Sequence, residues 1–110
     1  MAEKLAQKPI FTYEKAAAML PEVRRLTEEA YREVEALTKG GPEGGDAEAR
    51  IDEVVSRWAE AMARWGLEVK GLWLVDFDNG SGYYCWRHPE ERLMYYHSYE
   101  ECFRGRLRIQ

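Results

Sequence analysis

The sequence predicts one α+β domain, in which an antiparallel helical hairpin packs on a three-stranded antiparallel β-meander. Apolar residues recur at helical spacing on both sides of a glycine-rich turn within residues 11–66, whereas residues 67–110 contain short aromatic and branched runs separated by turns. Neither layer can bury an apolar face alone, so the two are expected to pack together. A length of 110 residues and a hydrophobic content of 45% suit a single core. Residues 1–10 are expected to form a polar leader.

The first helix has a clear start signal and an ambiguous interior. Thr12 is a good N-cap, and Phe11 before it can pack on Ala16 as a hydrophobic staple. Pro21 permits two interpretations: one kinked helix, or a short helix that ends near Leu20 followed by a longer one. The kinked helix is favoured.

The rest of the helical hairpin follows from two amphipathic stripes. Residues 40–45 form the turn, Asp46 is a natural N-cap for the second helix, and Gly66 is expected to end that helix. The apolar stripes consist of Val23, Leu26, Ala30, Val34 and Leu37 in the first helix, and Ile51, Val54, Val55, Trp58, Ala61, Met62 and Trp65 in the second. We interpret the aromatic part of the second stripe as core, because aromatic stripes on helices are normally buried.

Strands are expected over residues 71–77, 83–87 and 93–99, with turns at 78–82 and 88–91. If Arg87 and Arg92 close the second turn, two-residue alternation puts His97 on the same side as Trp86 and opposite Cys85. The register of the first hairpin stays open. A two-residue loop at Asn79-Gly80 puts Asp76 with Cys85 and Arg87, whereas a three-residue loop puts it with Trp86 and His97. The first register is favoured, because it builds the better apolar face.

Charge and composition exclude some classes of function. A net charge of -4 disfavours nucleic-acid binding, which needs a positive field. No apolar run is long enough to span a bilayer, and the first residues contain no signal-peptide core. A cytoplasmic protein is therefore expected, with Cys85 and Cys102 as reduced thiols.

An ordered set of short motifs resembles a family of short uncharacterised prokaryotic proteins, domain of unknown function 2203. The resemblance covers nearly the whole chain after residue 10, and it implies a bacterial or archaeal cytoplasmic protein without an established activity. The motifs are Phe11-Thr12, Leu20-Pro21-Glu22-Val23-Arg24, Gly66-Leu67-Glu68-Val69-Lys70, Leu74-Val75-Asp76-Phe77, Cys85-Trp86-Arg87, Tyr96-His97 and Phe103-Arg104-Gly105-Arg106.

This chain departs from the family pattern at several positions. Lys15 stands where the family often has Glu, Asp78 where it has Pro, and Tyr96 where it has Trp. The family tends to place a small Gly-Glu turn where this chain has His88-Pro89-Glu90, so His88 is not carried over as a family-level functional residue. The polar residues that match are Asp76, Arg87, Glu90, His97 and Arg106, and they are the candidate ligand-binding residues.

These candidates allow two kinds of site, each with a plain structural alternative. Asp76 with Arg87 could bind an anion or carboxylate, or could be a surface ion pair. Asp76 with His97 could serve acid–base chemistry or a metal, or His97 could be a hydrogen-bonded histidine among tyrosines. No ligands follow a metal-binding spacing, so no metal set is assigned. Cys85 is interpreted as a packing residue, and a Cys85–His97 nucleophile pair is disfavoured by strand alternation.

Two functions remain from different classes. The leading one is a protein-interaction or self-associating module that uses exposed tyrosines of the sheet. The alternative is a small-ligand or metal-binding domain, with enzyme activity left open, centred on the candidate residues. No catalytic residue, cofactor or substrate is assigned, because no constellation meets the geometric requirements of catalysis. The tyrosines concerned are Tyr83, Tyr95, Tyr96 and Tyr99.

Overall fold

The computed structural model describes residues 9–40, 46–101 and 103–109, so most of the expected leader and of the glycine-rich turn lies outside the described residues. The fold is α+β, as expected, with a helical hairpin followed by an antiparallel sheet. In chain order the described elements are α2 (Tyr13–Lys39), α3 (Asp46–Arg64), β1 (Glu68–Gly71), β2 (Leu74–Asp78), β3 (Gly82–Arg87), β4 (Tyr95–Ser98), the 3-10 helix η1 (Phe103–Gly105) and β5 (Leu107–Arg108).

The helix boundaries follow from the capping residues. The side-chain oxygen of Thr12 accepts a hydrogen bond from the Lys15 amide at 3.1 Å, which starts α2. The helix continues through Pro21, which confirms the interpretation as one helix. Asp46 is helical itself and lies in the first turn of α3, where a negative charge is favoured. Gly66, at φ +87°, lets the chain turn away after α3.

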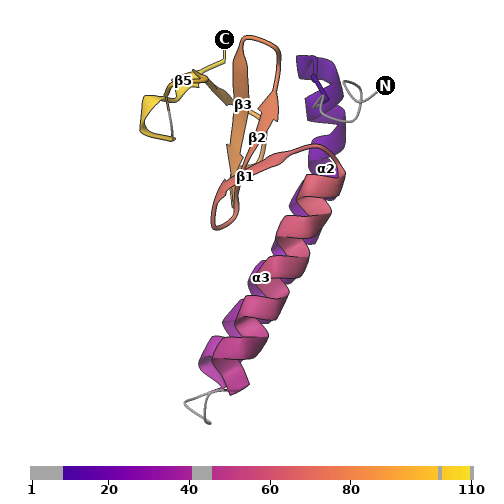
Figure 1. The fold of residues 1–110 in the computed structure, drawn as a ribbon, viewed down its shortest axis with the longest axis vertical. Coiled ribbons are helices and arrows are strands. Elements are labelled where there is room, and N and C mark those ends of the chain that lie inside the picture. The colour runs from indigo at the N-terminus through magenta and orange to yellow at the C-terminus, as the bar shows by residue number, and fades with distance from the viewer. Residues whose placement is uncertain (1–8, 41–45, 102, 110) are drawn as a thin grey trace, which may run out of the picture.

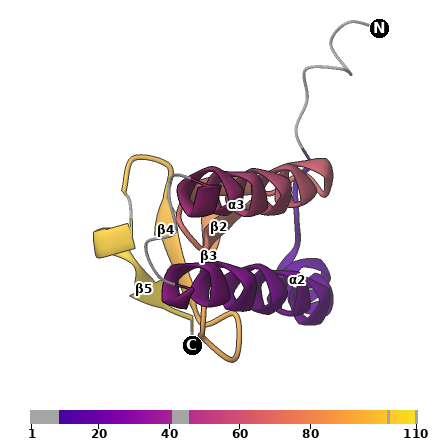
Figure 2. The same cartoon turned by 90° about the horizontal axis from the view of Figure 1, so that it is seen from below.

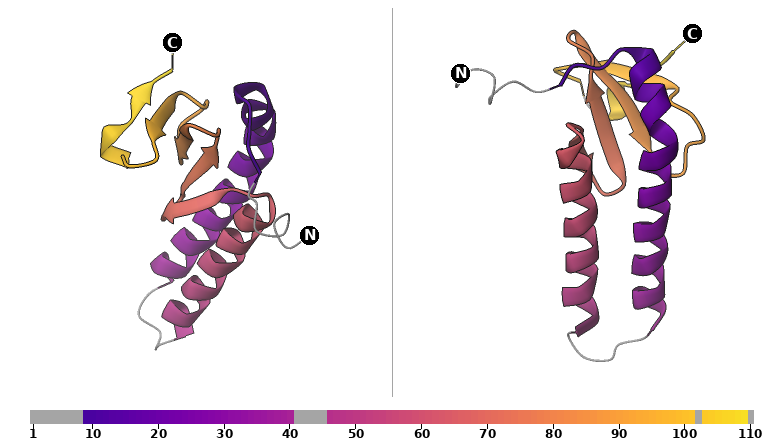
Figure 3. Two further views of the ribbon diagram at one scale, coloured as in Figure 1. Left: turned by 45° about the horizontal axis from the view of Figure 1, so that its top comes forward. Right: turned by 90° about the vertical axis from the view of Figure 1, so that its right-hand side faces the viewer.

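The two helices lie side by side and antiparallel, and the sheet lies against one end of the pair (Figures 1 and 2). α2 is the longer helix, and its N-terminal turns run past the end of α3 and along the sheet (Figure 3). The other end of the hairpin extends beyond the sheet, which gives a molecule of 46 × 38 × 25 Å. No helix within the described residues is long and apolar enough to cross a membrane.

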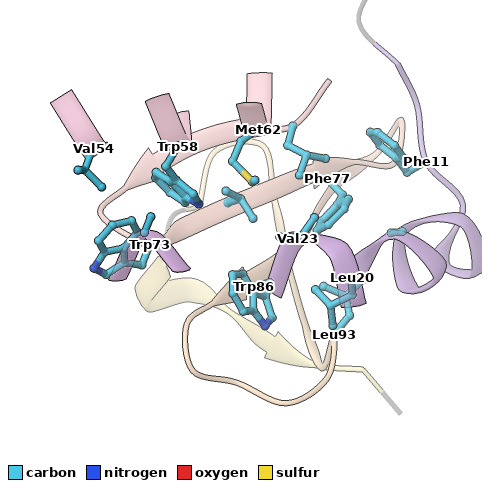
Figure 4. Packing of buried hydrophobic residues seen from close by; sticks show 14 residues of the cluster. Phe11, Leu20, Val23, Val54, Trp58, Met62, Trp73, Phe77, Trp86 and Leu93 are labelled. Carbon is cyan, nitrogen blue, oxygen red and sulfur yellow. The ribbon is translucent and has the colours of Figure 1, made fainter. Parts of the chain in front are cut away.

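The core fills the space between the helices and one face of the sheet (Figure 4). Phe11 meets Phe77 edge to face, with ring centroids 5.5 Å apart, and Trp58 meets Trp73 at 4.9 Å. Thr27 is fully buried and accepts a hydrogen bond from the Trp58 indole at 2.8 Å, which joins α2 to α3. The stripe of α3 is core as predicted, with Trp65 partly buried at its end.

The sheet is larger than expected: within the described residues it has five strands in the order β1-β2-β3-β4-β5, not three. The run 71–77, predicted as one strand, is broken by a turn at Leu72-Trp73, because Trp73 adopts φ +62° and packs into the core. The fifth strand is a short pairing of Leu107 and Arg108 with the start of β4.

The first hairpin has the favoured arrangement of faces. Val75 pairs with Trp86 and Asp76 pairs with Cys85, so Asp76 lies on the face away from the core. The loop is displaced by one residue from the predicted position, because the Asn79 amide bonds the Gly82 carbonyl at 2.8 Å. This displacement leaves the assignment of side chains to faces unchanged.

Candidate functional site

The candidate site lies on the sheet face that points away from the helices. Directly paired residues of antiparallel strands project to the same face. Asp76 on β2 pairs with Cys85 on β3, and two positions along β3 Tyr83 pairs with His97 on β4. Asp76, Cys85 and His97 therefore share one face, and all three are buried.

The prediction that Cys85 and His97 lie on opposite faces is wrong. It assumed that Tyr84 opposes Tyr95, whereas the structure pairs Tyr84 with Tyr96 and Cys85 with Tyr95. A shift of one residue moves every side chain of β4 to the other face.

The cause of the shift is the connection between β3 and β4, which spans residues 88–94 instead of a four-residue turn. The Trp86 indole donates to the Glu90 carbonyl at 2.9 Å, and the Tyr13 hydroxyl donates to the Leu93 carbonyl at 2.9 Å. Leu93 itself is buried in the core rather than paired in a strand. These contacts set where β4 begins, and hence its register.

The centre of the site is a contact between Asp76 and His97. His97 Nε2 lies 3.0 Å from Asp76 Oδ2, and His97 Nδ1 lies 2.8 Å from the Ser98 carbonyl oxygen. A carbonyl can only accept, so Nδ1 carries a proton. Nε2 is the ring nitrogen that faces the Asp76 carboxylate. The side chains of Asp76 and His97 are only 1% and 3% exposed.

Lys70 is the second cationic partner of the same carboxylate oxygen. Its Nζ lies 3.1 Å from Asp76 Oδ2 and 3.9 Å from the centre of the Tyr83 ring. Burial disfavours the ammonium, but the hydrogen bond and charge of Asp76 outweigh it and raise the pKa of Lys70. Asp76 Oδ1 is also buried, yet it receives no hydrogen bond from the described residues.

Cys85 completes the cluster, because its sulfur and ligand atoms of Asp76 and His97 lie within 4.8 Å of one another. Burial raises the pKa of the Cys85 thiol to about 12, and the Asp76 carboxylate acts in the same direction while Arg106 opposes it. Nucleophilic cysteines have a lowered pKa. The environment of Cys85 therefore argues against nucleophilic catalysis, although Cys85 and His97 share a face.

A pocket of about 360 Å³ opens over this cluster. Its floor comes from the sheet, and part of its wall comes from the segment around η1. We refer to it as the Asp76 pocket. It is lined by Lys70, Leu74, Asp76, Cys85, His97, Glu101, Phe103 and Arg104.

The other candidate residues form a neighbouring group that holds η1 against the sheet. The Arg106 guanidinium lies 4.0 Å from the ring centres of both Tyr95 and Phe103. Arg106 Nη1 lies 2.8 Å from Glu90 Oε2, as an ion pair without the alignment of a hydrogen bond. Arg87 lies 5.3 Å from the Phe103 ring rather than on Asp76. The predicted pair of Asp76 with Arg87 is therefore replaced by Asp76 with Lys70 and His97.

Sequence reasoning missed two residues that shape the pocket. Lys70 lies on β1, which was not expected as a separate strand, so nothing placed it near Asp76. Phe103 belongs to a motif of the family resemblance but was not among the candidate ligand-binding residues, because those were all polar or charged. His88 lies apart, 3.7 Å from Glu28 on α2, and does not line the Asp76 pocket.

Comparisons with known proteins agree with the resemblance seen in the sequence. No curated protein and no solved structure matches the chain. The family model described as "Uncharacterized conserved protein (DUF2203)" matches residues 9–109, which include every strand of the site and the η1 segment. The chain therefore belongs to the DUF2203 family.

Proposed function

We propose that this chain is a single small-ligand-binding domain whose site is the Asp76 pocket. The observation that carries the proposal is the Asp76 carboxylate, which is 1% exposed and has a buried oxygen without a hydrogen bond from the described residues. Leaving a buried acceptor unpaired costs about 1–3 kcal/mol, and more for a charged group. A ligand or ion that contacts this oxygen would remove that cost.

The surroundings of the carboxylate suit a binding site better than a purely structural ion pair. The pocket of about 360 Å³ lies within the size range of small-molecule sites. His97 is fixed by its bond to the Ser98 carbonyl, and Lys70 sits at the pocket edge with a side chain 37% exposed. The proposal includes a cytoplasmic location in a prokaryote, which the family resemblance implies.

A thermal-shift panel tests this proposal. Untagged protein is heated with divalent metals, inorganic phosphate, small carboxylates and nucleotides, each at several concentrations. A ligand at a hundredfold excess over its Kd stabilises the folded state by about 2.7 kcal/mol, which corresponds to a Tm increase of about 10 °C for a domain of this size. We expect at least one member of the panel to raise the Tm.

The matched pair of variants is His97→Ala and His88→Ala, because these are the two histidines of the chain. The ligand-dependent increase should disappear in His97→Ala and persist in His88→Ala. A panel without any shift, or a shift that both variants retain, would contradict the proposed site.

Self-association is a second candidate, and one observation favours it. Tyr96 on β4 and Leu107 on β5 are register partners on one face, and they are 41% and 57% exposed. β5 is an edge strand of the described sheet, so its outer edge could pair with a second copy of the chain. Of the tyrosines that suggested an interaction surface, Tyr83 and Tyr95 instead contact Lys70 and Arg106.

Sedimentation over a wide range of protein concentrations tests this second candidate. The double variant Tyr96→Ser/Leu107→Ser should abolish a concentration-dependent dimer. Leu72→Ser, which removes a residue 56% exposed near the opposite edge strand, should leave that dimer intact. A wild-type protein that stays monomeric at the highest concentration would exclude self-association.

A further inference from the structure

We propose that the Asp76 pocket binds a zinc-type divalent cation through Asp76, Cys85 and His97. This inference rests on the proposed ligand-binding function and names the ligand class. One carboxylate, one thiol and one imidazole meet there from three neighbouring strands, and all three side chains are buried. The pairing of β2 with β3 and of β3 with β4 fixes the positions of their backbones.

The spacing of the ligand atoms suits one tetrahedral ion. With zinc–nitrogen and zinc–oxygen bonds of about 2.0 Å, two ligand atoms of a tetrahedral site lie about 3.3 Å apart. His97 Nε2 and Asp76 Oδ2 are already 3.0 Å apart, and one sulfur joins them within 4.8 Å. A side-chain adjustment of about 1 Å at Cys85 would complete the three-ligand set.

The contacts around the ligands are those that a metal site needs. Metal-binding histidines usually donate their second ring N–H to a carbonyl or carboxylate, which fixes the ring. His97 Nδ1 makes such a bond, at 2.8 Å to the Ser98 carbonyl, and this directs Nε2 toward Asp76. Asp76 Oδ1 is buried without a hydrogen bond from the described residues, so its lone pairs are available to a cation.

The charges already present are consistent with a cation at this position. Asp76 Oδ2 lies 3.1 Å from Lys70 Nζ and 3.0 Å from His97 Nε2, so the buried carboxylate sits beside the Lys70 ammonium. A bound cation would replace the proton between His97 and Asp76 and the proton of the Cys85 thiol, and both protons would leave to solvent. Lys70 can withdraw, since its Nζ is also 3.7 Å from Glu68 Oε1.

The donor types select the class of metal. Thiolate and imidazole favour zinc and related transition metals, whereas magnesium and calcium prefer oxygen ligands throughout. Three protein ligands would leave a fourth position for water or an anion, as in catalytic rather than structural zinc sites. The Asp76 pocket lies over the cluster and can hold that fourth ligand.

Cobalt absorption spectroscopy tests the assignment, because Co²⁺ replaces Zn²⁺ and reports its ligands. Titration of the 110-residue protein with Co²⁺ should give intense visible bands of tetrahedral geometry and a thiolate charge-transfer band in the near ultraviolet. One equivalent of Zn²⁺ should abolish both. Cys85→Ser should lose the charge-transfer band, whereas Cys102→Ser should keep it.

The affinity of Co²⁺ gives a second measure. Loss of a contact that only orients a ligand already weakens metal binding by about 10–100-fold, so His97→Ala should weaken it by more than about 100-fold. The matched variant His88→Ala should bind like the wild type. Near-ultraviolet circular dichroism of each metal-free variant checks that its core is folded.

X-ray absorption on the zinc-loaded wild-type protein needs no variant. We expect one sulfur at about 2.3 Å and nitrogen or oxygen ligands at about 2.0 Å. A shell without sulfur, or a charge-transfer band that Cys85→Ser retains and Cys102→Ser loses, would overturn the assignment. Stabilisation by phosphate or a carboxylate that depends on His97, without any response to zinc or cobalt, would overturn the metal but leave the ligand-binding function standing.

Discussion

Replacement of Thr27 by Val should loosen the joint between the two helices. The Thr27 hydroxyl is fully buried and accepts a hydrogen bond from the buried Trp58 indole at 2.8 Å. Valine has nearly the same shape as threonine, so packing is conserved while the acceptor is lost. The variant therefore isolates the contribution of one buried hydrogen bond.

The expected magnitude follows from the burial of both partners. A buried donor without an acceptor costs about 1–3 kcal/mol, and the added methyl group of valine recovers about 0.8 kcal/mol. The free energy of unfolding should therefore fall by about 0.2–2 kcal/mol. For a domain of this length, each kcal/mol corresponds to about 4 °C, so the Tm should fall by up to about 8 °C.

Denaturant unfolding followed by tryptophan fluorescence measures the change. Thr38→Val is the matched control, because the Thr38 hydroxyl donates to the Val34 carbonyl on an exposed part of α2. That control should stay within about 0.5 kcal/mol of the wild type. Equal stability of the two variants would refute the role assigned to the hydrogen bond.

Three further predictions concern the sheet and the site. Trp73 adopts φ +62°, a backbone angle that glycine tolerates better than alanine. In urea denaturation, Trp73→Gly should therefore be about 1 kcal/mol more stable than Trp73→Ala. The opposite order of stability would contradict the turn at this position. A Cβ at Gly82 would lie 2.5 Å from the His97 carbonyl oxygen, so Gly82→Ala should lower the free energy of unfolding by about 1–3 kcal/mol. Gly71→Ala is the control and should lower it less, because a Cβ there meets only ordinary contacts at 3.6 Å. Equal losses in the two variants would argue against the β3–β4 register. Because burial raises the pKa of Cys85 to about 12, a disulfide reagent at neutral pH should label Cys85 in a Cys102→Ser background only as the protein unfolds, and rapid labelling of the native state would contradict its burial.

The helical hairpin could be predicted because its signals are local. Thr12 caps a helix through its side-chain oxygen, and Gly66 ends one because it tolerates a positive φ. The helical spacing of a long apolar stripe is visible in the sequence without knowledge of its packing partner. The extra strand β1 could not be predicted in this way. The turn that follows β1 contains Leu72 and Trp73, whose residue types are not typical of turns. The Trp73 indole is buried against Trp58, and Trp73 has an unusual backbone angle.

The arrangement of the candidate residues could be predicted only in part, because it depends on tertiary contacts. Asp76 and His97 were among the candidates, and the face of Asp76 was correct, because Asn79 and its neighbours signal a tight hairpin. The meeting of His97 with Cys85 was missed. Burial of Leu93 in the core holds the seven residues between β3 and β4 in place. This contact shifts the pairing of β4 with β3 by one residue, and no local sequence pattern reveals it.

Anomalous diffraction at the zinc absorption edge, from crystals of the zinc-loaded protein, tests most directly whether the Asp76 pocket is a binding site of this kind. We predict a peak within about 2.0–2.3 Å of Asp76, Cys85 and His97. A peak elsewhere, such as between His88 and Glu28, or no peak at all despite saturating zinc, would contradict the assignment.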